Sequence, residues 1–198
     1  MSLSKKKEEE VFIRPLKESD LKNVQSFTDR WIGQDYYSYS ELQDAFKKGN
    51  QGALNASFIA LSGDDVVGVR LTYAPGTWIE SSTEIFKKGL STKEWKVPSP
   101  KMGYFKSLFV HGDFQGKGIG KVLSNKALSI LKEMGAEAVL CHSWMESPEN
   151  SSQRYLLKMG FQKIKEHPKF WYEIDYFCPR CGPSRCVCTA GEMIKFLD

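Results

Sequence analysis

The sequence lacks any apolar run close to the roughly 20 residues that a membrane-spanning helix needs. It also lacks a signal peptide, because its first ten residues, MSLSKKKEEE, are charged and have no apolar centre. A strong charge bias is missing as well: the net charge of +4 is too small to indicate nucleic-acid binding, although it suits a protein that handles an anionic ligand. We therefore predict a cytoplasmic protein, with residues 1–10 as a charged tail, that binds neither a membrane nor nucleic acid.

Internal repeats and low-complexity segments are also missing from the sequence. A chain of 198 residues with 41% hydrophobic and 26% charged residues can bury a core without crosslinks. A reducing compartment disfavours disulfides, so the five cysteines need another explanation. We predict a single domain over residues 11–198.

Hydrophobic periodicity predicts strands and helices that alternate irregularly along the chain. The predicted strands cover residues 11–16, 56–74 (a hairpin), 101–110, 136–144, a stretch from 161, 169–177 and 192–198. The predicted helices begin after Ser19, begin after Ser40, run from about 116 to 135, and cover 150–160. Residues 75–100 are expected to be an insertion between strands, with a short helix near 82–88. This order indicates an α/β (α+β) fold with a mixed sheet and helices on it, and it disfavours a doubly wound dinucleotide fold.

A glycine-rich turn, GDFQGKGIGKVL (Gly112–Leu123), joins a predicted strand to the longest predicted helix. The start of a helix carries unpaired N–H groups and a partial positive charge. Glycines allow an anion to approach that backbone, and two lysines nearby add charge; these residues are Gly116, Gly118, Gly120, Lys117 and Lys121. The turn therefore predicts a phosphate or pyrophosphate site, although a tight connection without a ligand is the alternative.

The turn matches neither of two common phosphate motifs. A P-loop needs Ser or Thr after its lysine, and a dinucleotide fingerprint needs a different glycine spacing. Residues Gln115–Gly120 instead resemble the Gln/Arg-x-x-Gly-x-Gly/Ala signature of the GNAT superfamily of acyl-CoA N-acyltransferases. Tyr155–Phe161 is similar to a later helix of that family, which ends in Gly-Phe, and Glu192–Leu197 is similar to its last strand. The resemblance implies a GNAT-like mixed, mostly antiparallel sheet flanked by helices.

The resemblance also implies an activity: transfer of an acetyl group from acetyl-CoA to a primary amine by direct attack in a ternary complex. The pantetheine arm would pair with the strand, where a backbone N–H near Phe109 or Val110 would stabilise the oxyanion. Asn150 would contact the arm, or would only cap the following helix. The residues implied in acetyl-CoA binding are Leu108, Phe109, Val110, Gln115, Gly116, Lys117, Gly118, Ile119, Gly120, Lys121 and Asn150.

The catalytic acid and base are less sharply indicated. Tyr155 is the candidate acid, but it lies five residues before Gly160, and in the family the tyrosine commonly lies four before that glycine. A helical shift of one residue turns a side chain by about 100°, so packing in the core is the alternative for Tyr155. Glu146 is the candidate base, and the alternatives are His142, His111 and Asp113.

Aromatic residues gather between the first two predicted helices and in the insertion. They either border the acceptor site or pack the protein itself; they are Trp31, Tyr36, Tyr37, Tyr39, Trp78 and Trp95.

Four cysteines gather in FCPRCGPSRCVC, between the last two predicted strands. Cys178 and Cys181 form a Cys-Pro-Arg-Cys-Gly knuckle, and Cys186 and Cys188 complete four thiolates, which suits Zn²⁺. We predict a structural zinc site in this loop, residues 178–188, with disulfides, free thiols or an iron–sulfur cluster as alternatives, because the spacing between the pairs is short. Cys141 is expected to be a buried core thiol.

The sequence is consistent with two functions. The first is an acetyl-CoA-dependent N-acetyltransferase acting on a small-molecule or protein amine. The second is a non-catalytic acyl-CoA-binding or sensing protein with a zinc-stabilised docking loop. The sequence identifies neither the acceptor nor the oligomeric state, for which a homodimer is one option.

Overall fold

The computed structural model describes residues 10–176 and 178–197. All of the predicted charged tail except Glu10 lies outside the described residues. The strands are β1 (Val11–Pro15), β2 (Asn50–Gln51), β3 (Leu54–Asn55), β4 (Phe58–Ser62), β5 (Asp65–Tyr73), β6 (Met102–Val110), β7 (Ala138–Trp144), β8 (Gln162–His167) and β9 (Ala190–Phe196). The α-helices are α1 (Leu21–Trp31), α2 (Tyr39–Lys48), α3 (Glu84–Lys87), α4 (Ile119–Glu133) and α5 (Ser151–Lys158).

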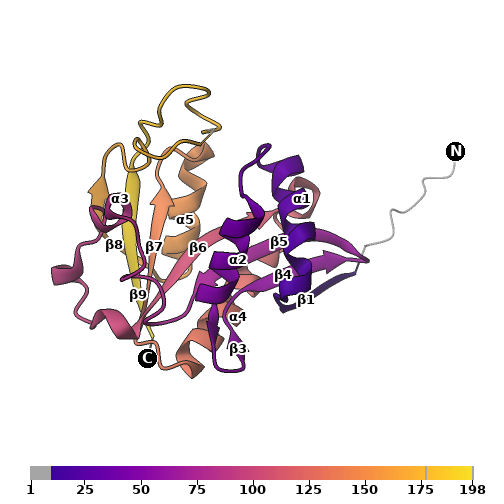
Figure 1. Ribbon diagram of the computed structural model, residues 1–198, viewed down its shortest axis with the longest axis horizontal. Coiled ribbons are helices and arrows are strands. Elements are labelled where there is room, and N and C mark those ends of the chain that lie inside the picture. The colour runs from indigo at the N-terminus through magenta and orange to yellow at the C-terminus, as the bar shows by residue number, and fades with distance from the viewer. Residues whose placement is uncertain (1–9, 177, 198) are drawn as a thin grey trace, which may run out of the picture.

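Seven strands form one mixed sheet in the order β1-β4-β5-β6-β7-β9-β8 (Figure 1). Within it only β6 and β7 pair in parallel, and the other neighbours are antiparallel. The predicted mixed, mostly antiparallel sheet flanked by helices is therefore confirmed. The last strand of the described residues, β9, lies between β7 and β8, inside the sheet and not at its edge.

The parallel strands β6 and β7 separate before they end. Their register runs from Met102↔Ala138 to Phe105↔Cys141 and stops there. Beyond this point β6 continues to Val110 with β5 as its partner, after a register shift that leaves Lys106 as an extra residue. Along residues 106–110, the edge of β6 that faces β7 therefore has no strand partner among the described residues.

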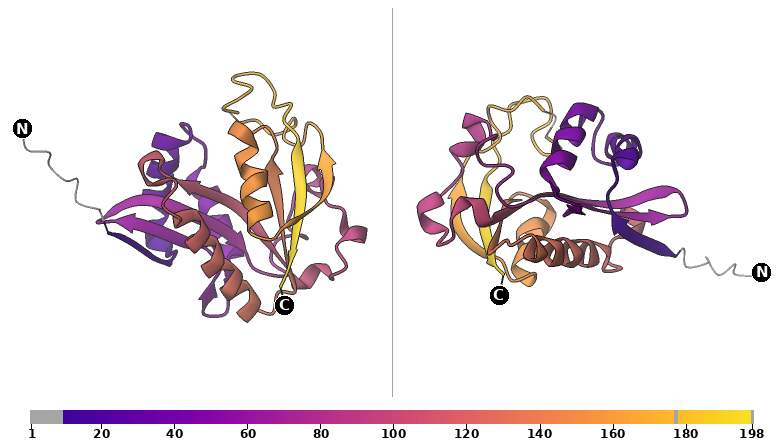
Figure 2. Two further views of the ribbon diagram at one scale, coloured as in Figure 1. Left: turned by 180° about the vertical axis from the view of Figure 1, so that it is seen from behind. Right: turned by 60° about the horizontal axis from the view of Figure 1, so that its bottom comes forward.

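The helices cover both faces of the sheet (Figure 2). On one face α4 and α5 enclose a core that includes Leu123, Leu131 and Leu156. On the opposite face α1 and α2 bury a second core, and residues 75–100 bury a third beside it; Tyr73 packs against both. The apolar stripe of α4 follows the helical period that the sequence predicts. Within the described chain, no helix is both long enough and apolar enough to cross a membrane.

The predicted insertion is a packed part of the domain. Trp78 and Trp95 are each 1% exposed and lie in the core under residues 75–100. The indole N–H of Trp78 donates to the Met102 carbonyl at 2.8 Å, and that of Trp95 donates to the Glu192 carboxylate at 2.8 Å. These two aromatic residues therefore pack the protein and do not border an open site.

Two local predictions are wrong. Residues 169–176 form turns and not a strand, because Lys169 has a positive φ of 54° that bends the chain. The apolar side chains there pack on His142 and on the cysteines and do not alternate across a sheet. The second helix begins at Tyr39, because Ser38 and not Ser40 caps it: Ser38 Oγ accepts from the Glu41 N–H, while the Glu41 carboxylate accepts from the Ser38 N–H.

Candidate active site

The glycine turn leads from β6 into α4 through a 3-10 turn at Gly112–Phe114. Gly116 and Gly118 have positive φ values of 75° and 81°, and Gly118 is the N-cap of α4. A Cβ added at either position would meet no atom within 4 Å, so these glycines serve the backbone conformation and leave open space beside it. Gly120 has another role, because a Cβ there would lie 3.2 Å from Leu108 Cδ2.

The part of the turn that leads into α4 presents positive charge and no acid. The first turn of α4 has no acidic residue, and residues 115–118 are exposed. The Lys117 ammonium lies 4.9 Å from the centre of the Phe114 ring, a cation–π distance that keeps it beside the turn. An exposed helix start with free N–H groups and a lysine is the arrangement that binds phosphate groups.

The open edge of β6 lies directly before this turn. His111 N–H donates to the Val67 carbonyl of β5, so by strand alternation the Phe109 N–H also faces β5. The N–H of Val110 then faces the open edge, as does its carbonyl, which accepts from Gln115 Nε2 at 3.1 Å. This edge offers strand-like pairing to an extended ligand.

Asn150 lies at the N-cap of α5 but its side chain makes no cap hydrogen bond. Its Nδ2 donates to Gln153 Oε1 at 2.9 Å. The Oδ1 atom of Asn150 and the Nε2 atom of Gln153 are buried and have no partner among the described residues. Buried polar atoms are rarely left unpaired, so a donor and an acceptor are available here for a bound amide.

Tyr155 ties α5 to the first turn of α4. Its hydroxyl lies 2.8 Å from the Gly120 carbonyl and 2.7 Å from Ser124 Oγ. The neighbouring Leu156, which occupies the position where the family commonly has tyrosine, is buried in the core. Because the tyrosine is one residue earlier in this sequence than is common in the family, Tyr155 lies half-buried between the two helices.

A buried arginine completes this group. Arg70, on β5, donates to Ser124 Oγ from Nε at 3.2 Å and from Nη2 at 2.8 Å, and its guanidinium lies 4.1 Å from the Phe105 ring centre. Burial lowers the pKa of Arg70, because its charge lies in the core. The sequence analysis missed Arg70, although a single arginine inside the apolar run VVGVRLTYA was a signal for it.

Two of the candidate bases, Glu146 and His142, have protein partners. Both carboxylate oxygens of Glu146 accept from the Thr189 N–H, at 3.0 and 2.9 Å, at the base of the cysteine loop. His142 lies one residue beyond the last β6–β7 pair; its Nε2 lies 2.8 Å from the Gly89 carbonyl and its Nδ1 lies 3.1 Å from the Tyr104 hydroxyl. Burial lowers the pKa of His142 to about 4, so its ring is neutral at pH 7.

The other two alternatives lie near the glycine turn. His111 packs edge-on against Trp31, with ring centres 4.1 Å apart, and its Nδ1 accepts from the Asp113 N–H at 3.2 Å. His111 and Asp113 are therefore at the beginning of the turn, past the end of β6.

The aromatic residues between α1 and α2 pack largely on β6. Tyr37 is buried, and its hydroxyl lies 2.6 Å from Ser107 Oγ. Tyr36 packs edge-on against Tyr37 and Phe109, with ring centres 4.9 and 5.5 Å apart. Trp31 remains 48% exposed. The α1–α2 connection thus covers the β6 segment where it has separated from β7.

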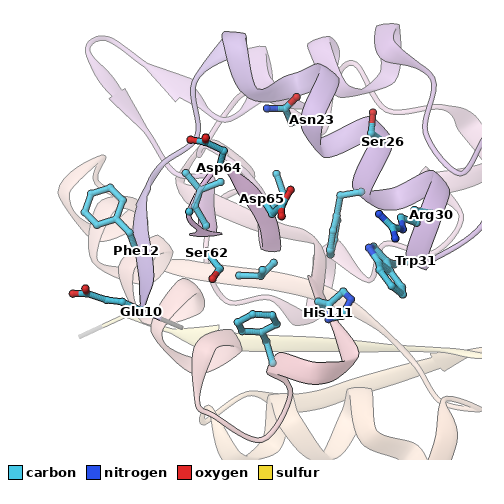
Figure 3. A pocket seen from close by; sticks show the side chains of 16 residues that line it. Glu10, Phe12, Asn23, Ser26, Arg30, Trp31, Ser62, Asp64, Asp65 and His111 are labelled. Carbon is cyan, nitrogen blue, oxygen red and sulfur yellow. The ribbon is translucent and has the colours of Figure 1, made fainter. Parts of the chain in front are cut away.

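A cavity of about 1110 Å³ lies between α1, the β4–β5 turn and the end of β6 (Figure 3). Arg30, Trp31 and His111 lie together on one side of it, while Glu10 and Phe12 lie across from them. Its lining includes Phe114 of the glycine turn but none of residues 115–121 and none of residues 106–110 on the open β6 edge, so the cavity adjoins the turn and does not contain the residues predicted to bind acyl-CoA.

The four cysteines of the loop come together. Their sulfur atoms all lie within 4.8 Å of one another, with Cys178–Cys188 at 3.9 Å and Cys181–Cys188 at 3.7 Å. Four sulfurs bound to one zinc at about 2.3 Å in a tetrahedron lie about 3.8 Å apart, so the cluster fits that ion. All five cysteines are free, and Cys141 is buried as expected.

The loop also favours thiolate formation at one position. Burial opposes ionisation of the Cys178 thiol, but hydrogen bonds from the N–H groups of Cys181 and Arg180 outweigh it and lower its pKa to about 7. The sulfur of Cys186 accepts from the Tyr176 hydroxyl at 3.3 Å. Such donors to sulfur are typical of metal-binding knuckles.

Comparison with known proteins agrees with this geometry. The model of the acetyltransferase (GNAT) family matches residues 20–161, most of the chain, so the protein belongs to that family. The chain is 31% identical over 100 residues to the uncharacterised N-acetyltransferase CT2212 of Chlorobaculum tepidum. This match spans 49% of the chain and 57% of that relative, little more than half of its length.

Solved structures share the fold over nearly the whole chain. Arabidopsis thaliana NAA60 in complex with acetyl-CoA superposes with a TM-score of 0.65 at 16% identity, over 95% of this chain and 99% of that one. Arabidopsis thaliana Naa50 in complex with the bisubstrate analogue CoA-Ac-MVNAL gives 0.62 at 17% identity, over 94% and 99%. The Escherichia coli ribosomal-protein-S18-alanine N-acetyltransferase gives 0.63 at 13% identity, over 96% and 95%.

Proposed function

We propose that the protein is an acetyl-CoA-dependent N-acetyltransferase in which a primary amine attacks the thioester directly within a ternary complex. The observation that carries the proposal is the open edge of β6 running into a glycine turn of left-handed Gly116 and Gly118. Acetyl-CoA supplies the thioester, and the N–H groups of residues 116–121 hold its pyrophosphate, since the Gln115 N–H donates to the Gly112 carbonyl at 3.1 Å. Leu108, Val110 and Asn150 hold the pantetheine arm, for which the unpartnered Asn150 Oδ1 is a ready acceptor.

The chain's own groups support direct transfer. The Val110 N–H faces the open edge and is the better candidate than Phe109 for binding the oxyanion. The amine nitrogen bonds to the acetyl carbon, the carbon–sulfur bond breaks, and the thiolate that leaves takes up a proton. Holding both reactants in one cleft can supply much of the rate acceleration in such a reaction.

Tyr155 and Glu146 are the candidates for acid and base. Each already has a protein partner, so each must give up or share a hydrogen bond in order to move a proton. Glu146→Gln keeps the side-chain size and removes the base. If Glu146 is the base, the rate of transfer falls by about 10²-fold or more at pH 7.

The acceptor is a small-molecule or protein amine. Peptide α-amines are the first class to test, because a neighbour of this fold was solved with CoA-Ac-MVNAL. Release of CoA thiol, measured over peptides, polyamines and amino acids, should depend on one of these acceptors. If the protein binds acetyl-CoA but releases no thiol with any acceptor, the second function is favoured, a non-catalytic acyl-CoA-binding or sensing protein. One observation supports this second function: the Tyr155 hydroxyl already has hydrogen-bond partners within the protein.

We further propose that the four loop cysteines hold one structural Zn²⁺, and the sulfur separations support this. Elemental analysis of protein purified under reducing conditions should find one zinc per chain. Free thiols throughout accord with the predicted cytoplasmic location. A homodimer is one option for the oligomeric state, which light scattering would measure.

A further inference from the structure

The cysteine cluster is connected to the point where β6 and β7 separate. The Phe170 N–H donates to the carbonyl of Cys188 at 3.1 Å, so one of the four cysteines fixes the backbone of Phe170. The neighbouring Trp171 packs against the cluster itself, as does Trp144 at the end of β7. The cluster and Phe170 are therefore parts of one local unit.

Phe170 in turn covers His142. The two rings are stacked, with centres 4.6 Å apart and planes 13° apart. Gly89 of the insertion lies against the same phenyl ring, since a Cβ on Gly89 would be 2.0 Å from Phe170 Cε2. The carbonyl of Gly89 lies 2.8 Å from His142 Nε2. His142 is the residue of β7 that follows the last pair with β6, on the face that carries α1 and α2. The phenyl ring thus forms a wall at the separation of the strands.

The cysteine loop also faces the α1–α2 connection. Figure 1 shows the cysteine loop and the α1–α2 connection at the same end of the molecule. An acceptor amine that approaches the thioester from this face passes between these two segments.

We propose that metal binding by the four cysteines fixes Phe170 on His142 and thereby forms one wall of the acceptor cleft. The inference rests on the proposed transferase function and zinc site. Between β8 and β9 the described residues form no helix or strand, only an isolated bridge between Cys178 and Gly182. Without a metal, the loop is held only by side-chain packing on Trp144 and Trp171 and by a few hydrogen bonds, and clustered thiolates repel each other. Loss of the ion therefore releases Phe170, while the glycine turn on the other face is unaffected.

The first test compares zinc-loaded protein with protein stripped by a chelator under reducing conditions. Both samples are treated with diethyl pyrocarbonate, and the rate of modification of each histidine is read by mass spectrometry. We expect His142 to react at least about tenfold faster without zinc, because the loop opens locally. His111 is the internal control, since it packs on Trp31 and Phe114, far along the chain from the cysteine loop, and its rate should not change.

Two variants distinguish the effect of the Phe170 side chain on His142 from the effect of the bound metal. Phe170→Ala should bind a full equivalent of zinc and yet leave His142 as reactive as in stripped protein. Tyr172→Ala is the matched control, because Tyr172 is an exposed aromatic residue of the same turn, and its His142 should remain protected. With an amine found in the acceptor panel, Phe170→Ala should raise the KM for that amine and leave the Kd for acetyl-CoA unchanged.

Three results would overturn the proposal: equal reactivity of His142 with and without bound zinc, protection of His142 that survives Phe170→Ala, or protein that binds no metal. Calorimetry with acetyl-CoA on the same samples tests the transferase assignment separately. Protein that fails to bind acetyl-CoA but shows zinc-dependent protection of His142 would refute the proposed function and leave the metal-dependent wall standing.

Discussion

Substitution of Gly118 by Glu tests the acyl-CoA site directly. Gly118 is exposed, begins α4 and has a φ of 81°. Any other L-residue there strains the backbone, by about 1–2 kcal/mol. Gly118→Gln carries the same strain with no charge, so the difference between the Glu and Gln variants isolates the effect of one negative charge on a bound pyrophosphate.

The size of that difference follows from the geometry. A carboxylate at residue 118 would extend into open space beside the turn, because a Cβ there meets no atom within 4 Å. At a separation of about 6 Å, one pair of unit charges interacts with ~0.7 kcal/mol in water and with ~2.8 kcal/mol at the effective dielectric of a protein surface. We therefore expect Gly118→Glu to bind acetyl-CoA about 3- to 100-fold more weakly than Gly118→Gln.

Isothermal titration calorimetry with acetyl-CoA measures the two dissociation constants, and circular dichroism verifies that both variants are folded. The gap between the variants should shrink as salt is raised from 0.05 M to 0.5 M, because exposed charges are screened. Equal affinities of the Glu and Gln variants at low salt would refute the assignment of the pyrophosphate to this turn.

Three further predictions concern the other parts of the site. Tyr155→Phe should lower kcat by about 10²-fold with the Kd for acetyl-CoA unchanged if Tyr155 is the acid; a change in Kd alone would make it a residue that positions α4. Cys181→Ser should lower both the zinc content and the melting temperature while acetyl-CoA binding persists, and an unchanged melting temperature would argue against a structural metal. Because burial lowers the pKa of His142 to about 4, the unfolded chain takes up its proton first, and stability present above pH 6.5 is lost as the pH falls to 4. In denaturant unfolding, the free energy of unfolding of His142→Gln should fall less between pH 6.5 and pH 4 than that of the wild type, by up to ~3 kcal/mol. If the two proteins lose the same free energy of unfolding over this pH range, the prediction is wrong.

The parts of the fold that could be predicted from sequence are those with a local signal. The strand, glycine turn and striped helix around α4 carry their own periodicity and turn chemistry, and the structure has them where they were expected. The cysteine knuckle is also a local pattern, and its four sulfurs do converge.

The predictions that failed concern segments whose structure depends on residues far away in the sequence. KFWYEIDYF has the composition of a strand, but Phe170 is drawn to His142 and the chain bends at Lys169. No local pattern reveals that Tyr155 meets the Gly120 carbonyl on another helix, or that Ser124 links it to Arg70. Tertiary contacts of this kind outweigh the local preference of a segment for helix or strand. The polar groups that they bury need hydrogen-bond partners, and those partners come from distant parts of the sequence.

The match to the family ends at Phe161, so the cysteine loop lies beyond it, and the structure attaches this loop and residues 75–100 to the same part of the sheet. Glu192 of β9 is fully buried, and its carboxylate accepts from the Ser91 N–H at 2.9 Å, from the Trp95 indole N–H at 2.8 Å, and lies 2.9 Å from His167 Nε2. Burial opposes ionisation of Glu192, but these hydrogen bonds hold its pKa below the usual value. A buried carboxylate is stable only with such partners, so it anchors the insertion on β9.

The cysteine loop reaches the same region because it leads directly into the beginning of β9, close to Glu192. Phe170, in the turns that precede the loop, and Gly89 of the insertion meet on His142, so the two segments support each other there. Both lie on the face opposite α4, and neither contributes to the glycine turn. Under the proposed function, the glycine turn holds acetyl-CoA on the α4 side, and both segments lie on the side that we propose for the acceptor, where differences in substrate choice within a shared fold have to be made.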